Sequence, residues 1–206
     1  MLFNILALIS VIIVITTLKK VVSIFPSLIA CIIRWKESVN LEASVKLKRD
    51  RDIIAFTMII PFCLTAARFR LYDPGFMKGL GDTAYLGAII GTFAAYIIIR
   101  NILDAIFLPP RKRRKGEGIA IRCSYSFFII LTFLLLAAGS ILTFANVGEE
   151  TVRCTMLWIS GLTYTLFTIR KTQIFINSGS FFAAFLYLCA LEFLPTGLLI
   201  ASGVIF

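Results

Sequence analysis

The sequence has no histidine, few charged residues and no closely spaced cysteine pair. Without an imidazole there is no histidine-dependent catalytic triad or general base, and most metal sites lose their commonest ligand. The cysteines lie singly in or beside apolar runs, which favours buried thiols over a disulfide framework or a zinc site. They are Cys31, Cys63, Cys123, Cys154 and Cys189. We therefore expect no metal and no cofactor.

Apolar residues dominate the chain. They make up 59% of it, and only 16% of residues are charged, whereas a soluble protein has about 25% charged residues. The apolar residues form runs that approach the roughly 20 residues a helix needs to cross a bilayer. These runs are continuous rather than alternating, so helices are favoured over a barrel. We predict an all-α transmembrane helix bundle that forms a single domain over residues 1–206.

The runs predict about six spans. They cover Leu2–Leu18, Ile53–Ala67, Ala84–Arg100 with a helical extension to Pro109, Ser124–Val147, Cys154–Ile169 and Phe181–Phe206. The fifth run should end at Arg170 and Lys171, with a polar bend over Gln173–Ser180 after it.

Two segments between the first and second runs are expected to stay at the membrane surface. Val21–Ile33 is short and contains Pro26, so we interpret it as a half-buried or interfacial helix. The alternative is a seventh span, which would place Lys19 and Lys20 on the outer side. Arg34–Asp52 carries charges of both signs, with Trp35, Val39, Ala43 and Leu47 spaced like one face of an amphipathic helix.

Basic residues indicate the orientation. They gather after the first, third and fifth runs, above all in the block Arg111, Lys112, Arg113, Arg114 and Lys115. By the positive-inside rule, residues 34–52 and 109–123 form cytoplasmic loops and both termini are periplasmic. The net charge of +10 is thus explained by topology, and we expect a lipid bilayer rather than nucleic acid as the partner. The basic block could also attract anionic lipid.

Glu192 is the most informative single residue because it falls within the last run. An intramembrane carboxylate costs at least about 2.5–3.5 kcal/mol, so it should face the protein interior and have a partner. We predict an ion pair with Arg68 or Arg70. The pair would either fix helix register or take part in a proton or ion relay, and the first interpretation is favoured because transport pathways usually hold several buried acids.

Two weaker patterns lie in the third run. Gly87, Gly91 and Ala95 form a stripe of small residues that permits close helix approach, either within the bundle, which we expect, or to another subunit. Arg100 and Asp104 are spaced for a weak pair along one helix.

No catalytic residue is expected. Glu149-Glu150 resembles the paired glutamates of intramembrane CAAX-type proteases, but the spacing is one residue short and that family's histidines are missing. Ser178-Gly179-Ser180 has no histidine that could act as base for a rhomboid-like nucleophile. Both segments are interpreted as polar turns.

Three strings carry a resemblance to a known family. Phe185-Leu186-Tyr187-Leu188-Cys189-Ala190-Leu191-Glu192-Phe193-Leu194-Pro195, Phe25-Pro26-Ser27-Leu28 and Arg70-Leu71-Tyr72-Asp73-Pro74 resemble an uncharacterised bacterial integral membrane family, domain-of-unknown-function family 4271. The resemblance would cover most of the chain. It implies the inner membrane of a bacterium with two membranes, and it implies no activity.

Two functions are therefore expected to compete. The first is a non-catalytic inner-membrane subunit or scaffold that contacts other membrane subunits or further copies of itself. The second is a small transporter or channel that uses Glu192 as its intramembrane polar site.

Overall fold

The computed structural model describes residues 2–77, 79–107, 115–178 and 188–205, and every regular element in these ranges is helical. The elements are α1 (Leu2–Ile33), α2 (Trp35–Ala43), α3 (Val45–Thr57), α4 (Ile59–Arg68), the short 3₁₀ turn η1 (Gly75–Met77), α5 (Asp82–Phe107), α6 (Lys115–Phe144), α7 (Glu149–Ser178), the π-helical turn η2 (Cys189–Phe193) and α9 (Leu194–Ile205). The all-α prediction is confirmed for this part of the chain.

Three helices are long and apolar enough to cross a bilayer. They are Ile5–Ile33 in α1, Asp82–Ile106 in α5 and Gly118–Phe144 in α6. At most 28% of the most apolar stretch of any of them is buried within the fold. Contiguous exposed apolar surface marks an interaction with lipid or protein, and the length of these helices suggests a membrane protein.

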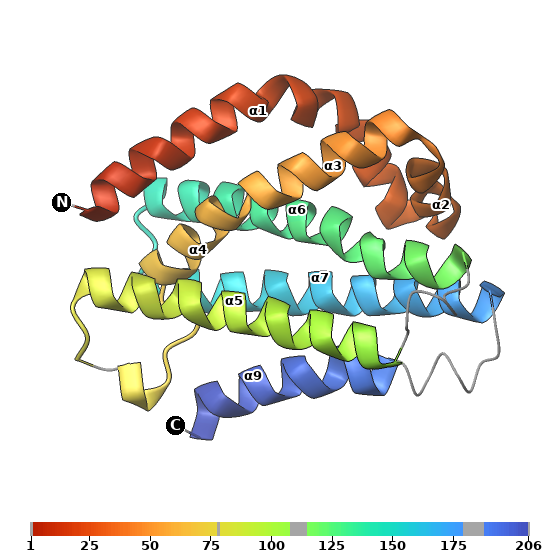
Figure 1. The fold of residues 1–206 in the computed structure, drawn as a ribbon. Coiled ribbons are helices and arrows are strands. Elements are labelled where there is room, and N and C mark those ends of the chain that lie inside the picture. The colour runs from red at the N-terminus through yellow and green to blue at the C-terminus, as the bar shows by residue number, and fades with distance from the viewer. Residues whose placement is uncertain (1, 78, 108–114, 179–187, 206) are drawn as a thin grey trace.

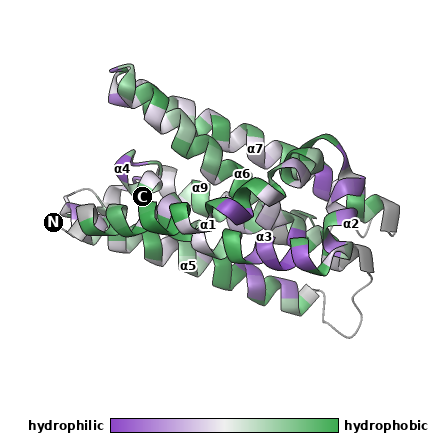
Figure 2. Cartoon of the chain, turned by 90° about the horizontal axis from the view of Figure 1, so that it is seen from above, coloured by the Kyte–Doolittle hydropathy of each residue, from purple (hydrophilic) through white to green (hydrophobic). Residues whose placement is uncertain are grey.

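α6 lies at the centre of the fold. It packs along α7 and also contacts α1, α2, α3 and α4, and Figure 1 shows α1 and α3 lying over it. Phe62 of α4, Phe93 of α5 and Phe128 of α6 meet with ring centroids 5.2–5.6 Å apart. Offset aromatic contacts of this kind add to the burial of apolar area. Hydrophilic residues gather over α2 and α3 (Figure 2).

The structure corrects the expected break after Leu18. α1 is one helix from Leu2 to Ile33, so Val21–Ile33 is not a separate interfacial helix. Lys19, Lys20 and Pro26 are all exposed. The helix can therefore continue past the two lysines without burying their charges. α1 arches over the other helices (Figure 1), and a proline within a helix commonly bends it.

The second run is divided between two helices, α3 and α4. α3 contains the charged second half of the expected amphipathic segment and also the first residues of the run, and α4 begins at Ile59. Pro61 has no N–H with which to bond Thr57, which accounts for the interruption at Met58. The amphipathic segment is itself two helices, because α3 starts afresh at Ser44, whose hydroxyl accepts a bond from the Leu47 N–H at 3.5 Å.

Two expected loops are partly helical. α7 continues through Arg170 and Lys171 to Ser178. The polar bend predicted to begin at Gln173 is therefore wrong for residues 173–178, which are helical. The expected basic loop 109–123 is helical from Lys115 onward, where α6 begins. Residues 109–114, with Arg111 to Arg114, lie outside the described residues, as do residues 179–187.

Candidate functional site

Glu192 lies at the centre of a buried group of charges. Its Oε1 accepts hydrogen bonds from Arg100 Nη2 at 2.7 Å and from Lys171 Nζ. The side chains of Glu192 and Lys171 are each 1% exposed, and that of Arg100 is 16% exposed. Arg100 comes from α5, Lys171 from α7 and Glu192 from η2, so one carboxylate oxygen joins three segments that are far apart in sequence. We call these three residues the Glu192 cluster.

A local change of helix geometry surrounds Glu192. The N–H of Leu194 bonds to the carbonyl of Cys189, the five-residue spacing of a π-helix. Pro195 follows and has no N–H to extend a regular ladder backwards. The Tyr164 hydroxyl donates to the Glu192 carbonyl at 3.1 Å, giving the disturbed backbone a second partner. Single π-turns within helices occur frequently at functional sites.

Aromatic and acidic side chains complete the surroundings. The Phe167 ring lies under both cations, with its centroid 5.7 Å from the Arg100 guanidinium and 5.5 Å from the Lys171 ammonium. Asp104, one turn beyond Arg100 on α5, is also buried, and its charge acts on Lys171. Two cations and two acids therefore lie close together, which offsets part of the cost of burying each charge.

One oxygen of Glu192 stays unused. Oε2 is buried and has no hydrogen-bond partner, a condition it shares among the described residues with Asp73 Oδ1 and Arg153 Nε. A buried polar atom without a partner costs free energy. The arrangement can therefore do two things chemically: it can hold three segments in register, and it leaves Oε2 able to accept a further hydrogen bond.

The expectation that Glu192 is buried and paired is confirmed, but the predicted partners are wrong. Arg68 is exposed, and Arg70 lies over the ring of Tyr85, 5.5 Å from its centroid. Tyr85 is near the start of α5 and Arg100 near its end, about four turns or 22 Å apart. Because α4 is short and ends beside the start of α5, neither predicted arginine can reach Glu192.

The small-residue stripe does not pack inside the fold. Gly87, Gly91 and Ala95 are all exposed on α5, and a Cβ added at either glycine would meet no atom within 4 Å. The interpretation as packing within the bundle is therefore wrong. Leu86 and Ile89, on the other side of α5, make the contacts with α4 instead.

A second group of charges lies between α2, α3 and α6. Glu42 accepts from Arg51 at 2.7 Å and from Arg122 at 3.3 Å, and Lys48 is 3.6 Å away. Arg51 also bonds to Asp52 at 2.7 Å. The Arg51 side chain is 2% exposed, but those of Lys48 and Arg122 are 35% and 41% exposed. We call this the Glu42 cluster.

The sequence contains a signal for the burial of Lys171 that charge distribution alone does not reveal. Phe167, Lys171, Ile174 and Phe175 follow the i, i+4, i+7, i+8 spacing of one helix face, and all four are buried. Reading Arg170-Lys171 as the end of a span treated both residues as surface charges. Only Arg170 behaves like a terminal charge, since it donates to the Ile32 and Ile33 carbonyls at 2.9 Å each, at the end of α1.

The described residues contain no group of three or more His, Cys, Asp or Glu side chains that could hold a metal ion. Comparisons with family models, with curated proteins and with solved structures found no match for this chain.

Proposed function

We propose that the chain is a multi-pass inner-membrane protein that works as a non-catalytic subunit or scaffold of a membrane complex. The observation that carries the proposal is the Glu192 cluster, in which one carboxylate joins α5, α7 and η2. Charges that bridge helices in an apolar bundle fix one arrangement of those helices at some cost in stability. A fixed arrangement of outward apolar faces is what a membrane scaffold needs.

The outward surface supports the same proposal. Gly87, Gly91 and Ala95 leave a smooth exposed strip on α5, and small residues let another transmembrane helix approach closely. We propose that this strip faces another membrane subunit or a second copy of the chain. About six crossings with both termini periplasmic remain our proposal for the topology, with the charged end that holds α2 and α3 in the cytoplasm.

The membership of domain-of-unknown-function family 4271 that the sequence resemblance implies is also proposed. It fits a bacterial inner-membrane location, and Glu192 lies in the longest of the three strings that resemble the family. It adds no activity to the proposal.

A second function is favoured by one specific observation. Glu192 Oε2 is buried, without a partner, on a π-helical turn, and Asp104 supplies another buried acid nearby. A small proton-coupled transporter or channel would use such an oxygen as its protonation site.

One set of variants separates the two functions. Glu192→Gln removes the carboxylate, Lys171→Met combined with Glu192→Leu replaces the buried pair by apolar side chains, and Glu150→Gln changes an exposed acid as control. For a scaffold, Glu192→Gln reduces the size of the particle purified in mild detergent. The apolar double variant restores that size, because replacing a buried pair by apolar residues is often neutral.

For a transporter, the results differ. All variants that fold keep the particle size of the wild type, but proton flux into vesicles is lost in both Glu192→Gln and the apolar double variant. A single-chain particle for the wild type in several detergents would argue against the scaffold, and absence of flux in the wild type would argue against the transporter.

A further inference from the structure

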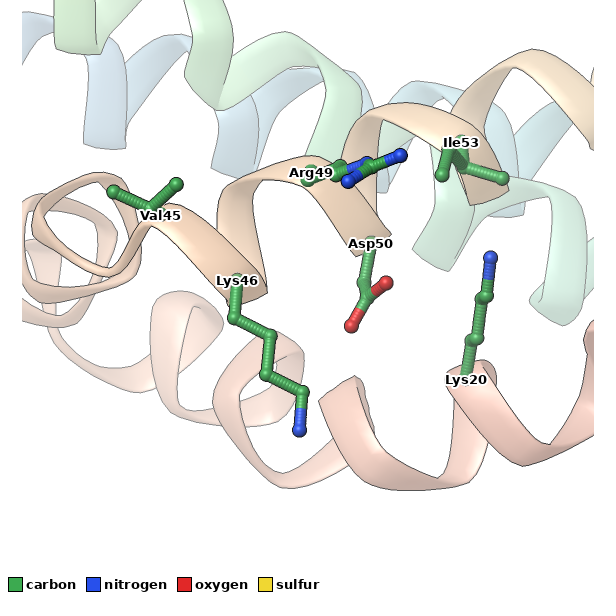
Figure 3. Close-up of a pocket in the computed structure, with 6 residues that line it drawn as sticks. All are labelled: Lys20, Val45, Lys46, Arg49, Asp50 and Ile53. Atoms are coloured by element: carbon green, nitrogen blue, oxygen red, sulfur yellow. The ribbon is translucent and has the colours of Figure 1, made fainter.

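A charged groove separates α1 from α3 on the flank of the fold. It has a volume of about 430 Å³ and is lined by Lys20 of α1 and by Val45, Lys46, Arg49, Asp50 and Ile53 of α3. Figure 3 shows Asp50 between Lys46 and Lys20, with its carboxylate pointing into the space between the two helices. The groove lies apart from the Glu192 cluster, which none of its lining residues touches.

The lining has more positive than negative charge. Three cations surround one carboxylate, and Lys20, Lys46 and Arg49 are exposed. Among the described residues, the ion pairs involve other cations, and none of these three takes part in one. The groove therefore offers several free N–H donors to an anion, in contrast to the Glu42 cluster, where the cations already have partners.

Apolar surface adjoins the charges. Lys20 lies inside the candidate span Ile5–Ile33, and Ile9, about three turns before it on the same face of α1, is 40% exposed. On α3, Val45 is 82% exposed and Phe56, one turn from Ile53, is 76% exposed. A lysine at this position is costly in lipid unless its ammonium group reaches the headgroup region or meets a negative charge.

From this juxtaposition we propose that the groove between α1 and α3 binds the phosphate headgroup of an anionic phospholipid. The phosphate accepts from Lys20, Lys46 and Arg49, and the acyl chains lie along the apolar face of α1 that carries Lys20 and the exposed Ile9. Arginine and lysine donors together with neighbouring apolar surface suit a lipid, because a soluble phosphate would use only the charged part. The proposal rests on the bilayer location but not on the scaffold role or on Glu192.

The test measures lipid binding to the purified full chain by native mass spectrometry in mild detergent. The probes are phosphatidylglycerol, phosphatidylcholine and inorganic phosphate. One variant carries Lys20→Gln, Lys46→Gln and Arg49→Gln, and a matched control with the same change in charge carries Lys19→Gln, Arg34→Gln and Arg68→Gln, all exposed residues outside the groove lining.

We expect the wild type to retain phosphatidylglycerol in preference to phosphatidylcholine. The groove variant should bind phosphatidylglycerol at least tenfold more weakly, since each basic residue near anionic lipid is worth about a factor of five. The control removes the same charge at residues that do not line the groove, so its loss of phosphatidylglycerol binding should be clearly smaller than that of the groove variant. Inorganic phosphate should not displace the lipid.

Three results would overturn the proposal. They are equal retention of both lipids by the wild type, equal losses in the groove and control variants, and displacement of phosphatidylglycerol by inorganic phosphate, which would assign the groove to a soluble anion. If the groove variant lacks the helical circular dichroism of the wild type, Asp50→Asn decides instead. Removing this carboxylate should strengthen phosphatidylglycerol binding, and unchanged or weaker binding would rule out the lipid site.

Discussion

Glu192 and Glu42 are both held by several cations, but their surroundings differ. Glu192 and its partner Lys171 are each 1% exposed, and the group joins α5, α7 and the C-terminal segment. Glu42 has one buried partner, Arg51, and two partners that reach water, Lys48 and Arg122. In both groups cations compensate the charge of a carboxylate, inside the apolar bundle for Glu192 and at its charged end for Glu42.

Ion pairs of similar geometry can therefore differ in how much they contribute to the free energy of unfolding. A buried charge that loses its partner keeps its full desolvation cost, whereas a partly exposed charge is compensated by water. The Glu192 cluster is therefore expected to be sensitive to every single change, and the Glu42 cluster only to changes at Arg51. The following predictions test this ordering.

The largest effect is expected for Glu192→Gln. It leaves Arg100 and Lys171 together in an apolar surrounding without the carboxylate between them, which should lower the free energy of unfolding by about 3–5 kcal/mol. Unfolding in mixed detergent micelles measures this, with Glu150→Gln as the control expected to match the wild type. A loss below about 1 kcal/mol would place the Glu192 cluster in the class of exposed pairs.

Arg51→Gln should have the next largest effect. It removes the bonds from the buried Arg51 guanidinium to Glu42 and Asp52 and the contact over the Tyr125 ring at 5.7 Å. Glu42 keeps Lys48 and Arg122, so the expected loss is about 2 kcal/mol in the same measurement. A loss as large as that of Glu192→Gln would show that burial of the two clusters does not set their sensitivity.

An apolar contact between α6 and α7 provides a reference for the stability losses expected in the two clusters. A Cβ at Gly139 of α6 would lie 2.7 Å from Met156 Cε of α7 and 3.0 Å from Phe69 Cε2. Gly139→Ala should therefore cost about 1 kcal/mol through overpacking, with the flexible methionine giving way in part. Gly91→Ala, on the open face of α5, is the control and should be neutral or slightly stabilising. Equal effects of both substitutions would contradict this packing.

The smallest effect is expected for Arg122→Gln. Its guanidinium is 3.3 Å from Glu42, but its side chain is 41% exposed, so the loss should be about 0.5 kcal/mol and should shrink further at high salt. Comparison with Arg51→Gln in the same buffer isolates the role of burial within one cluster. A salt-independent loss of more than about 2 kcal/mol would contradict a solvent-screened pair.

Some of the fold followed from the sequence alone. Long apolar runs required helices, and α5 continues beyond Arg100 to Phe107, as the predicted extension of the third run requires. The stop expected at Pro109-Pro110 lies outside the described residues. Boundaries marked only by charges were less reliable. Lys19-Lys20 and Arg170-Lys171 close apolar runs in the sequence, yet α1 and α7 continue through both pairs, because lysine and arginine favour helix and need only a suitable place for their charge.

Of the candidate site, only the buried position of Glu192 could be predicted from the sequence, and not the identity of its partners. A carboxylate in an apolar run demands a partner wherever the run lies, so the burial of Glu192 could be inferred from its position. Its partners depend on which helix ends meet, and the sequence does not show whether Arg68 and Arg70 lie at the level of Glu192. The short α4 places both beside the start of α5, while Arg100 and Lys171 lie at the level of Glu192.

Local sequence is enough to specify helices in the described residues, apolar segments long enough to cross a bilayer and the burial of Glu192 beside a cation. Local chemistry decides these points, because apolar length, helix propensity and the cost of a carboxylate in hydrocarbon are properties of each segment. The tertiary structure alone decided that Arg100 and Lys171 are the cations, that Gly87 and Gly91 face outward and that Lys20 meets α3 across a groove. Those points depend on how separate helices pack, which no single segment specifies.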